Sequence, residues 1–246
     1  MSVYREQPPP ASFARWIECA WLLASGTEEL AHRVPPDGCV DIVYGPSHGL
    51  RAIGAMTREQ RFHFPENVSL TGIRFRPGMA GTLLGVSPEE LTDGSVALED
   101  VWARRGPELK RRLDDAKSIQ EAMGLLLGSL TVPAEGPNPV QRAIEAIAAA
   151  NGNADLESVA FQANLSPRQF RRRCLEESGL TPKRLCRVLR FQHACRIAGS
   201  AERLNWSEIA LEAEYFDQAH LIRDFQDFTG LTPMAVFSNT RNRVLG

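Results

Sequence analysis

Two stretches in the second half of the chain decide the fold, because one repeats the other. Residues 157–182 read ESVAFQANLSPRQFRRRCLEESGLTP, and residues 207–233 read SEIALEAEYFDQAHLIRDFQDFTGLTP. Ala160 matches Ala210 at an offset of 50, whereas the closing Gly-Leu-Thr-Pro motifs match at an offset of 51, so the second copy holds one inserted residue. Two copies are too few for a solenoid, and they indicate a duplicated supersecondary unit.

Each copy predicts a helix, a tight turn and a second helix. Small alanines in the first helix allow the second to cross it closely, and an N-cap residue, Ser166 or Asp217, opens the second helix. Residues 166–169, Ser-Pro-Arg-Gln, also have the pattern of a capping box with proline in the first turn. A glycine follows each second helix, as a C-cap would. We therefore predict two helix-turn-helix units, whose second helices cover residues 167–177 and 218–228.

The second helices carry the candidate DNA contacts. Phe170 and Cys174 face inward in the first helix, as Leu221 and Phe225 do in the second. The outer faces then show Arg168, Arg171 and Arg172 in the first helix, and Gln218, His220, Ile222 and Arg223 in the second. Arginine can bind guanine edges or phosphates, glutamine can read adenine, and isoleucine can meet a thymine methyl group. The alternative is a solvated helix face. Trp206 and Phe216 are expected to pack in the core rather than to stack on bases.

The stretch between the two units predicts a long helix over residues 182–199, with Leu185, Val188, Leu189 and Cys195 facing inward. This helix would hold the two units at a fixed separation. Successive major grooves on one face of DNA lie about 34 Å apart, so one chain could read two of them without dimerising.

The first half of the chain predicts a different kind of domain. Short β-prone runs cover residues 19–24, 40–44, 62–64 and 68–75, with turn formers between them. Residues 87–90, Ser-Pro-Glu-Glu, resemble a capping box, and residues 107–116 and 118–130 predict helices. Met123, Leu126, Leu127 and Leu130 form one stripe that fits either an intradomain core or a dimer contact. Short antiparallel strands followed by helices indicate an α+β domain.

A stretch rich in proline and glycine separates the two halves. Residues 131–139 read TVPAEGPNP, which breaks any periodic pattern. We predict an N-terminal domain over residues 1–130, a linker over 131–139 and an all-α domain over 140–246. The net charge of −2 hides a split, because residues 1–137 hold 14 Lys and Arg against 18 Asp and Glu, whereas residues 138–246 hold 14 against 12.

Several classes of protein are disfavoured by composition. No apolar run is long enough for a membrane span, and residues 1–10, MSVYREQPPP, do not read as a secretory signal. Five scattered cysteines without a CxxC pair favour reduced thiols and a cytoplasmic protein, and Cys39 is expected to be an ordinary buried thiol rather than a metal ligand. We find no P-loop, GxSxG or HExxH motif, so we expect no enzyme, no metal and no cofactor.

The duplicated region resembles the AraC/XylS family of bacterial transcription regulators. The resemblance covers residues 140–237 and rests on Leu165-Ser166, both Gly-Leu-Thr-Pro motifs, Arg190 with Ala194, Glu208-Ile209-Ala210, Tyr215-Phe216-Asp217-Gln218 and Phe225. It implies a DNA-binding regulator, more commonly an activator, that contacts RNA polymerase. This sequence departs from the family at the two turns, where Asn164 and Glu214 replace glycine, and at Cys174, where phenylalanine is frequent. The resemblance also favours a dimer contact for the stripe 123–130.

The first half is also similar to the sensor domains of some family members. The matching pieces are residues 36–42, PDGCVDI, and 72–78, GIRFRPG. The resemblance implies that this domain binds a small molecule, dimerises, or both. Candidate ligand residues are Arg74 and Arg76, which share one strand face and could hold an anion, together with Trp21 and Tyr44. Their alternatives are an ion pair with Asp41 for the arginines and core packing for the aromatic rings. A regulator without a ligand, whose first domain only dimerises or binds a protein, remains the second hypothesis, and an enzyme fused to a DNA-binding domain is the third.

Overall fold

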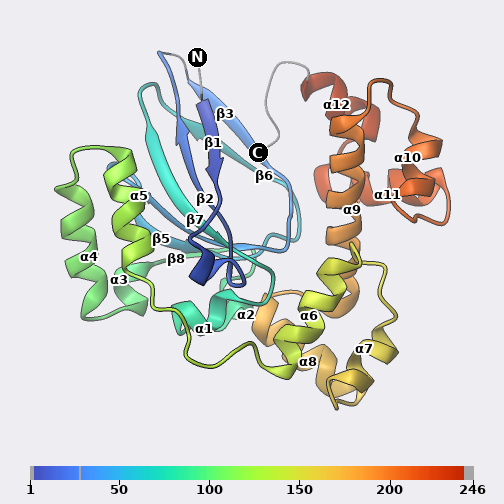
Figure 1. Ribbon diagram of the computed structural model, residues 1–246. Helices are drawn as coiled ribbons and strands as arrows, with labels where there is room; N and C mark the ends of the chain where they lie inside the picture. The colour runs from blue at the N-terminus through green and yellow to red at the C-terminus, as the bar shows by residue number, and fades with distance from the viewer. Residues whose placement is uncertain (1–2, 28, 241–246) are drawn as a thin grey trace.

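A computed structural model of the chain describes residues 3–27 and 29–240, and it shows a strand-rich N-terminal part followed by helices (Figure 1). The strands are β1 (Val3–Gln7), β2 (Ile17–Ala24), β3 (Leu30–Val34), β4 (Val40–Gly45), β5 (Gly49–Ile53), β6 (Gln60–Phe64), β7 (Ser69–Phe75) and β8 (Ser95–Ala97). The helices of this part are α1 (Ala80–Leu84), α2 (Pro88–Leu91), α3 (Leu98–Val101), α4 (Arg105–Asp114) and α5 (Ile119–Gly128). The predicted α+β class is confirmed.

Six of these strands form one antiparallel sheet in the order β1-β2-β7-β4-β5-β8, and β3 pairs with β6 in a separate ladder. Alternate residues of each strand point to opposite faces, so the sheet has two different surfaces. One face packs against α1 and α3–α5 through a buried cluster that includes Ile42, Ile73 and Phe75. The other face packs against β3 and β6 through a cluster that includes Trp21 and Leu70.

Helix α5 supplies the main cover of the helical face. Met123, Leu126 and Leu130 are buried, and Leu126 belongs to the same cluster as Ile73 of β7. The expectation that this stripe forms a dimer contact is therefore wrong for these three residues, because the sheet of the same chain already covers them. The intradomain alternative is the one that the structure adopts.

The strongest β patterns are confirmed, since β2, β4, β6 and β7 coincide with the four predicted runs within a few residues. Strands β1, β3, β5 and β8 were not predicted from their composition. They are short, and β1 and β3 carry charged residues, so their strand structure depends on their neighbours more than on their own propensity. The predicted capping box at Ser87 is wrong. Helix α2 is a single turn, and the Ser87 hydroxyl donates instead to the Glu176 carbonyl of α8, at 3.0 Å.

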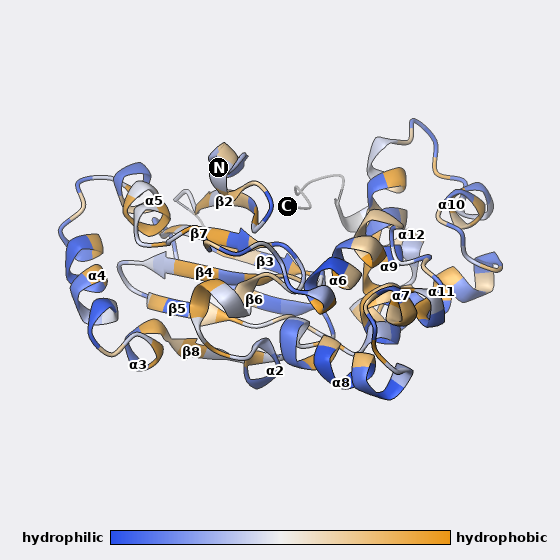
Figure 2. Ribbon diagram, turned by 60° about the horizontal axis from the view of Figure 1, so that its bottom comes forward, coloured by the Kyte–Doolittle hydropathy of each residue, from blue (hydrophilic) through white to orange (hydrophobic). Residues whose placement is uncertain are grey.

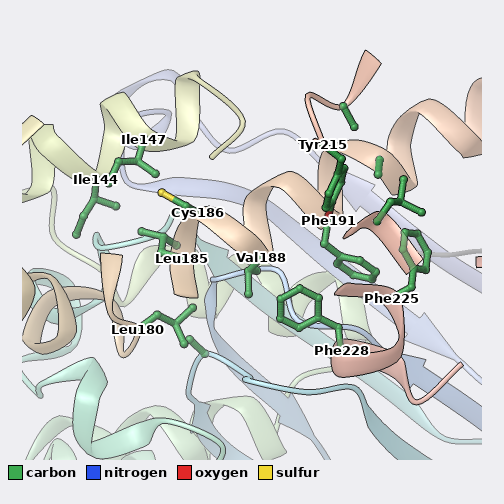
Figure 3. Packing of buried hydrophobic residues seen from close by; sticks show 14 of the residues in the cluster. Ile144, Ile147, Leu180, Leu185, Cys186, Val188, Phe191, Tyr215, Phe225 and Phe228 are labelled. Carbon is green, nitrogen blue, oxygen red and sulfur yellow. The ribbon is translucent and has the colours of Figure 1, made fainter. Parts of the chain in front are cut away.

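The C-terminal part is entirely helical within the described residues. Its helices are α6 (Pro139–Ala149), α7 (Leu156–Gln162), α8 (Pro167–Ser178), α9 (Pro182–Ser200), α10 (Trp206–Glu212), α11 (Gln218–Thr229) and α12 (Pro233–Thr240). Helix α9 is the predicted joining helix. Figure 3 shows Leu185 and Val188 beside Leu180 of the first unit, and Phe191 beside Phe225 of the second. One continuous core therefore connects both units through α9.

Residues 129–138, which contain neither helix nor strand, connect α5 to α6, and this is where we propose that the chain divides into two domains. Residues 1, 2 and 241–246, which the predicted domains include, lie outside the described residues. Within the described part of the chain, no helix combines the length and apolarity that crossing a membrane requires.

Candidate nucleic-acid interface

The two units are built alike at their turns. The Leu165 N–H donates to the Ala160 carbonyl at 3.0 Å, and the Tyr215 N–H makes the equivalent bond to Ala210 at 2.8 Å. The residue before each donor has a left-handed backbone, with φ of 55° at Asn164 and 57° at Glu214. The sequence placed these two residues where the family has glycine. Glutamate is the more strained of the two, since asparagine tolerates this conformation better.

The N-terminus of α8 presents the first group of arginines. Ser166 and Gln169 form the predicted capping box, and Phe170 and Cys174 are buried against the core. Arg168, Arg171 and Arg172 are exposed, and Arg172 pairs with Glu176 one turn later, at 2.5 Å. Helix α8 is accordingly coloured mostly as hydrophilic in Figure 2. This face can offer guanidinium groups to a groove without unfolding any part of the core.

The N-terminus of α11 presents the second group. The Asp217 carboxylate caps the helix by accepting from the backbone N–H of His220 at 2.6 Å. Gln218 and Arg223 are exposed. The Gln218 Oε1 accepts from the Ser207 hydroxyl at 2.7 Å, and this bond does not use the amide N–H groups of Gln218. His220 is half-buried, with its ring edge-on to Tyr215 at 5.0 Å between centroids. The histidine is thus held by a neighbour and offers less surface than the other two.

Two aromatic residues of this unit had been expected in the core. Trp206 is there, with its ring packed against Phe225 and Phe237. Phe216 is not, because 92% of it is exposed, and that prediction is wrong. The physical reason is the inserted residue. Tyr215 already fills the core position of the turn, so the additional residue has to lie outside.

The four predicted ligand residues of the N-terminal half do not form one site. Arg74 and Trp21 lie on the β3–β6 side of the sheet, where both contact Asp41. Tyr44 is buried on the opposite, helical side and its hydroxyl donates to Asp114 at 3.0 Å. Arg76 pairs with Glu18 at 3.0 Å, beyond the end of β7. The ion pair with Asp41 and the core packing of Tyr44 correspond to the alternatives named for these residues.

The Arg74 cluster joins the two N-terminal motifs. The Arg74 guanidinium lies 3.3 Å from Asp37 and 3.5 Å from Asp41, and the Trp21 indole N–H donates to Asp41 at 2.7 Å. Burial raises the pKa of Asp41 to about 6, and the nearby Asp37 acts in the same direction, whereas Arg74 and Trp21 oppose the shift. The folded protein therefore holds a proton on this carboxyl at a pH where the unfolded chain has released it.

This shift gives a first testable prediction. A raised folded-state pKa contributes stability below the unfolded value of 3.8, and that stability is lost as the pH rises through about 6. In the Asp41→Asn variant, which keeps an acceptor for Trp21, we expect this part of the pH dependence to disappear. Urea midpoints measured between pH 4 and pH 7 test it. An identical pH profile for both proteins would show that Asp41 titrates normally.

Comparisons with known proteins follow the same division of the chain. Residues 5–97 match a family described as a domain of unknown function (DUF6597). Residues 159–239, which contain both turns and helices α8 and α11, match a family described as a helix-turn-helix domain. The match shows a helix-turn-helix domain in the C-terminal half of the chain. No protein with a curated description matches the sequence.

Solved structures of similar proteins are distant. Apo ToxT from Vibrio cholerae, in a variant form, is 10% identical, and the match covers 94% of this chain and 99% of that one with a TM-score of 0.46. A DNA-binding transcriptional dual regulator from Escherichia coli K-12 is 20% identical over 45% of this chain and 99% of its own, with a TM-score of 0.38. The C-terminal domain of AraT, a response regulator from Geobacillus stearothermophilus, is 28% identical over 46% and 92%, with a TM-score of 0.38.

The N-terminal domain contacts the first helix-turn-helix unit through α2, which lies beside α8 in Figure 1. Ser87 and Thr92, which flank α2, donate to the carbonyls of Glu176 and Gly179 at the end of α8, at 3.0 and 2.9 Å. Arg15 makes two bonds of 2.9 Å to Glu145 of α6. These contacts use α6 and the C-terminal end of α8, and none of them involves Arg168, Arg171 or Arg172.

The same domain also contacts the joining helix and the second unit. The Gln192 amide of α9 donates to the Pro36 carbonyl at 2.7 Å, and Gly38 is so close to α9 that a Cβ there would lie 3.1 Å from Leu185. The Glu59 N–H, in the β5–β6 connection, donates to the Phe228 carbonyl of α11 at 2.7 Å. We call this whole set of contacts the seam. Sequence reasoning missed it. Its signals were Gly38 in one motif and Gly78 in the other, since a Cβ at Gly78 would lie 2.8 Å from Ile144 of α6.

Two hollows open along the seam. One, of about 500 Å³, lies beside Arg58, Arg61 and the end of α11, and the other, of about 720 Å³, lies between Thr92, Thr181 and Arg184. Arg184 crosses this region. It binds Asp227 of α11 at 2.6 Å and also donates to the Thr57 carbonyl, so it connects α9 both to α11 and to the N-terminal domain. The end of α8 lines one hollow and the end of α11 lines the other.

Proposed function

We propose that this protein is a transcription regulator whose two helix-turn-helix units read adjacent major grooves of one DNA duplex. The observation that carries the proposal is the like construction of the two units, each with an exposed helix N-terminus. Arg168, Arg171 and Arg172 are the proposed contacts of the first unit, and Gln218, His220 and Arg223 those of the second. The first group supplies more positive charge, so it contributes more of the salt-dependent affinity.

We further propose that the N-terminal domain controls DNA binding through a small-molecule effector. The seam supports this, because one domain contacts the first unit, α9 and the second unit at separate points. A ligand that favours one arrangement of the seam would shift the relative placement of the two reading helices. From the family resemblance, we propose that the protein acts in the cytoplasm. We also propose that the DNA-bound protein activates transcription by contact with RNA polymerase. Run-off transcription with and without the protein would measure this activation.

The seam gives a second prediction. In the double variant Arg15→Ala with Gln192→Ala, three seam hydrogen bonds are lost and no reading residue changes. We expect the affinity for a selected duplex to change by about fivefold or more, as in ordinary coupling between sites. Arg111→Ala is the matched control, because it breaks exposed ion pairs with Glu108 and Asp115 on α4, far from the seam.

The outcome separates two hypotheses. A changed affinity in the seam variant, with an unchanged control, supports control by the N-terminal domain. An unchanged affinity in both would contradict it and would favour a domain that only dimerises or binds a protein. In that case light scattering of the full-length protein should show a species larger than the monomer.

A further inference from the structure

The second turn contains a residue that the first turn lacks. The matching hydrogen bonds of Leu165 and Tyr215 place these two residues at the same position of the unit. In the first unit the N-cap Ser166 follows directly, whereas in the second Phe216 stands between Tyr215 and the N-cap Asp217. The inserted residue of the repeat is therefore Phe216.

Its exposure has no explanation in the packing of the chain. Phe216 is 92% exposed, whereas Tyr215 beside it is 4% exposed and fills the core. A phenylalanine ring in water gains nothing for the stability of the fold, since it removes almost no apolar area from solvent. Single exposed apolar side chains are common on protein surfaces, so the ring is informative because of its position next to α11 and not because of its exposure alone.

The place of this ring in the unit limits what the partner can be. In a helix-turn-helix the N-terminal end of the second helix enters the major groove. Phe216 directly precedes the N-cap of α11, and the exposed Gln218 and Arg223 follow within the first two turns. Figure 1 shows α10 on the side of the C-terminal domain away from the sheet, and α11 meets the N-terminal domain at its other end, where Phe228 accepts from Glu59. The N-terminal domain therefore leaves Phe216 exposed.

We propose that Phe216 packs on the deoxyribose backbone of duplex DNA at the rim of the second major groove. This inference rests on the proposed function. The carbons of the sugar present an apolar surface between phosphates, and a ring beside the helix N-terminus can cover it while Arg223 reaches a base or a phosphate. The contact carries no charge and reads no base edge. Its role is to position α11, which otherwise has only one exposed cation among its proposed contacts.

The test uses the full-length protein and a duplex that it selects from random sequence. Phe216→Ala should weaken binding by about tenfold, the effect of losing roughly 50–60 Å² of apolar contact. Phe216→Tyr keeps the ring and should bind like the wild type. Phe161→Ala is the matched control, because Phe161 is 81% exposed but belongs to the first helix of its unit, α7, and does not precede the N-cap of a second helix. All three variants should melt like the wild type.

Salt dependence distinguishes the loss of this apolar contact from an indirect loss, in which the substitution moves Arg223 away from a phosphate. Because a phenyl ring releases no counterions, Phe216→Ala should leave the slope of log affinity against log salt unchanged. Hydroxyl-radical footprinting should show one deoxyribose at the edge of the second site losing its protection in Phe216→Ala alone. A shallower slope, or the same loss of affinity in Phe161→Ala, would overturn the inference.

Failure of this inference can be told from failure of the proposed function. If the wild type binds its duplex with a steep salt dependence and Phe216→Ala binds equally well, the ring has no DNA contact and the proposed function stands. If the wild type selects no sequence and binds no duplex even at low salt, both are overturned.

Discussion

Alanine at Arg172 or at Arg223 should each weaken binding to the selected duplex by about 1–3 kcal/mol, the usual range for a base-reading arginine. Both side chains are exposed within the first two turns of α8 or α11. Neither belongs to the buried face of its helix, so their loss should not disturb the core. The loss should be specific to sequence, so the affinity for unrelated DNA should fall less. Fluorescence anisotropy with the selected duplex and with an unrelated duplex measures both affinities.

Arg111→Ala is the control for this experiment as well, because it removes an exposed arginine of α4 that faces no proposed DNA contact. Its affinity should equal that of the wild type. Unchanged affinity in both Arg172→Ala and Arg223→Ala would contradict a protein that reads DNA with two units. A loss in one variant only would leave one reading unit, and the other helix-turn-helix would need a different role.

Phe225→Ala should lower the free energy of unfolding by about 3–5 kcal/mol, as expected for a buried aromatic residue. The ring is fully buried, with centroids 4.8 Å from Phe191 of α9 and 5.8 Å from Trp206 of α10. It therefore joins α11 to α9 and α10, the two helices that its ring contacts. Chemical denaturation of the two full-length proteins measures the loss.

Phe161→Ala makes the same chemical change at an 81% exposed position, and it should alter stability by no more than about 0.5 kcal/mol. A similar loss in both variants would mean that the core of the second unit does not depend on Phe225. A loss confined to Phe225→Ala supports the core that connects α9, α10 and α11.

The helical half could be predicted in detail because its signals are local. Caps, turn residues and the apolar faces of α8 and α11 lie within a few residues of each other, and each of these signals occurs in both copies of the repeat. The left-handed Asn164 and Glu214 follow from the alignment with a glycine position. The prediction that Phe216 is buried was wrong because Tyr215 already fills the core position of this turn.

The N-terminal half was less predictable because its structure depends on distant partners. Strand β3 is half-polar and becomes a strand only by pairing with β6, about thirty residues later in the chain. An ion pair between the arginines and Asp41 was one of the alternatives that the sequence offered, but nothing in the sequence predicted that Asp37 also pairs with Arg74 or that Gly38 lies against α9. The arginines at 74 and 76 looked equivalent in the strand pattern, and only the packing shows that they point to different partners.

The central claim is that a single chain reads two successive major grooves, and hydroxyl-radical footprinting of the full-length protein on its selected duplex tests it most directly. The account predicts two protected windows on one face of the duplex, about one helical turn or 10 base pairs apart, with Arg172→Ala weakening one window and Arg223→Ala the other. A single window, or two windows that both weaken equally with either substitution, would contradict it.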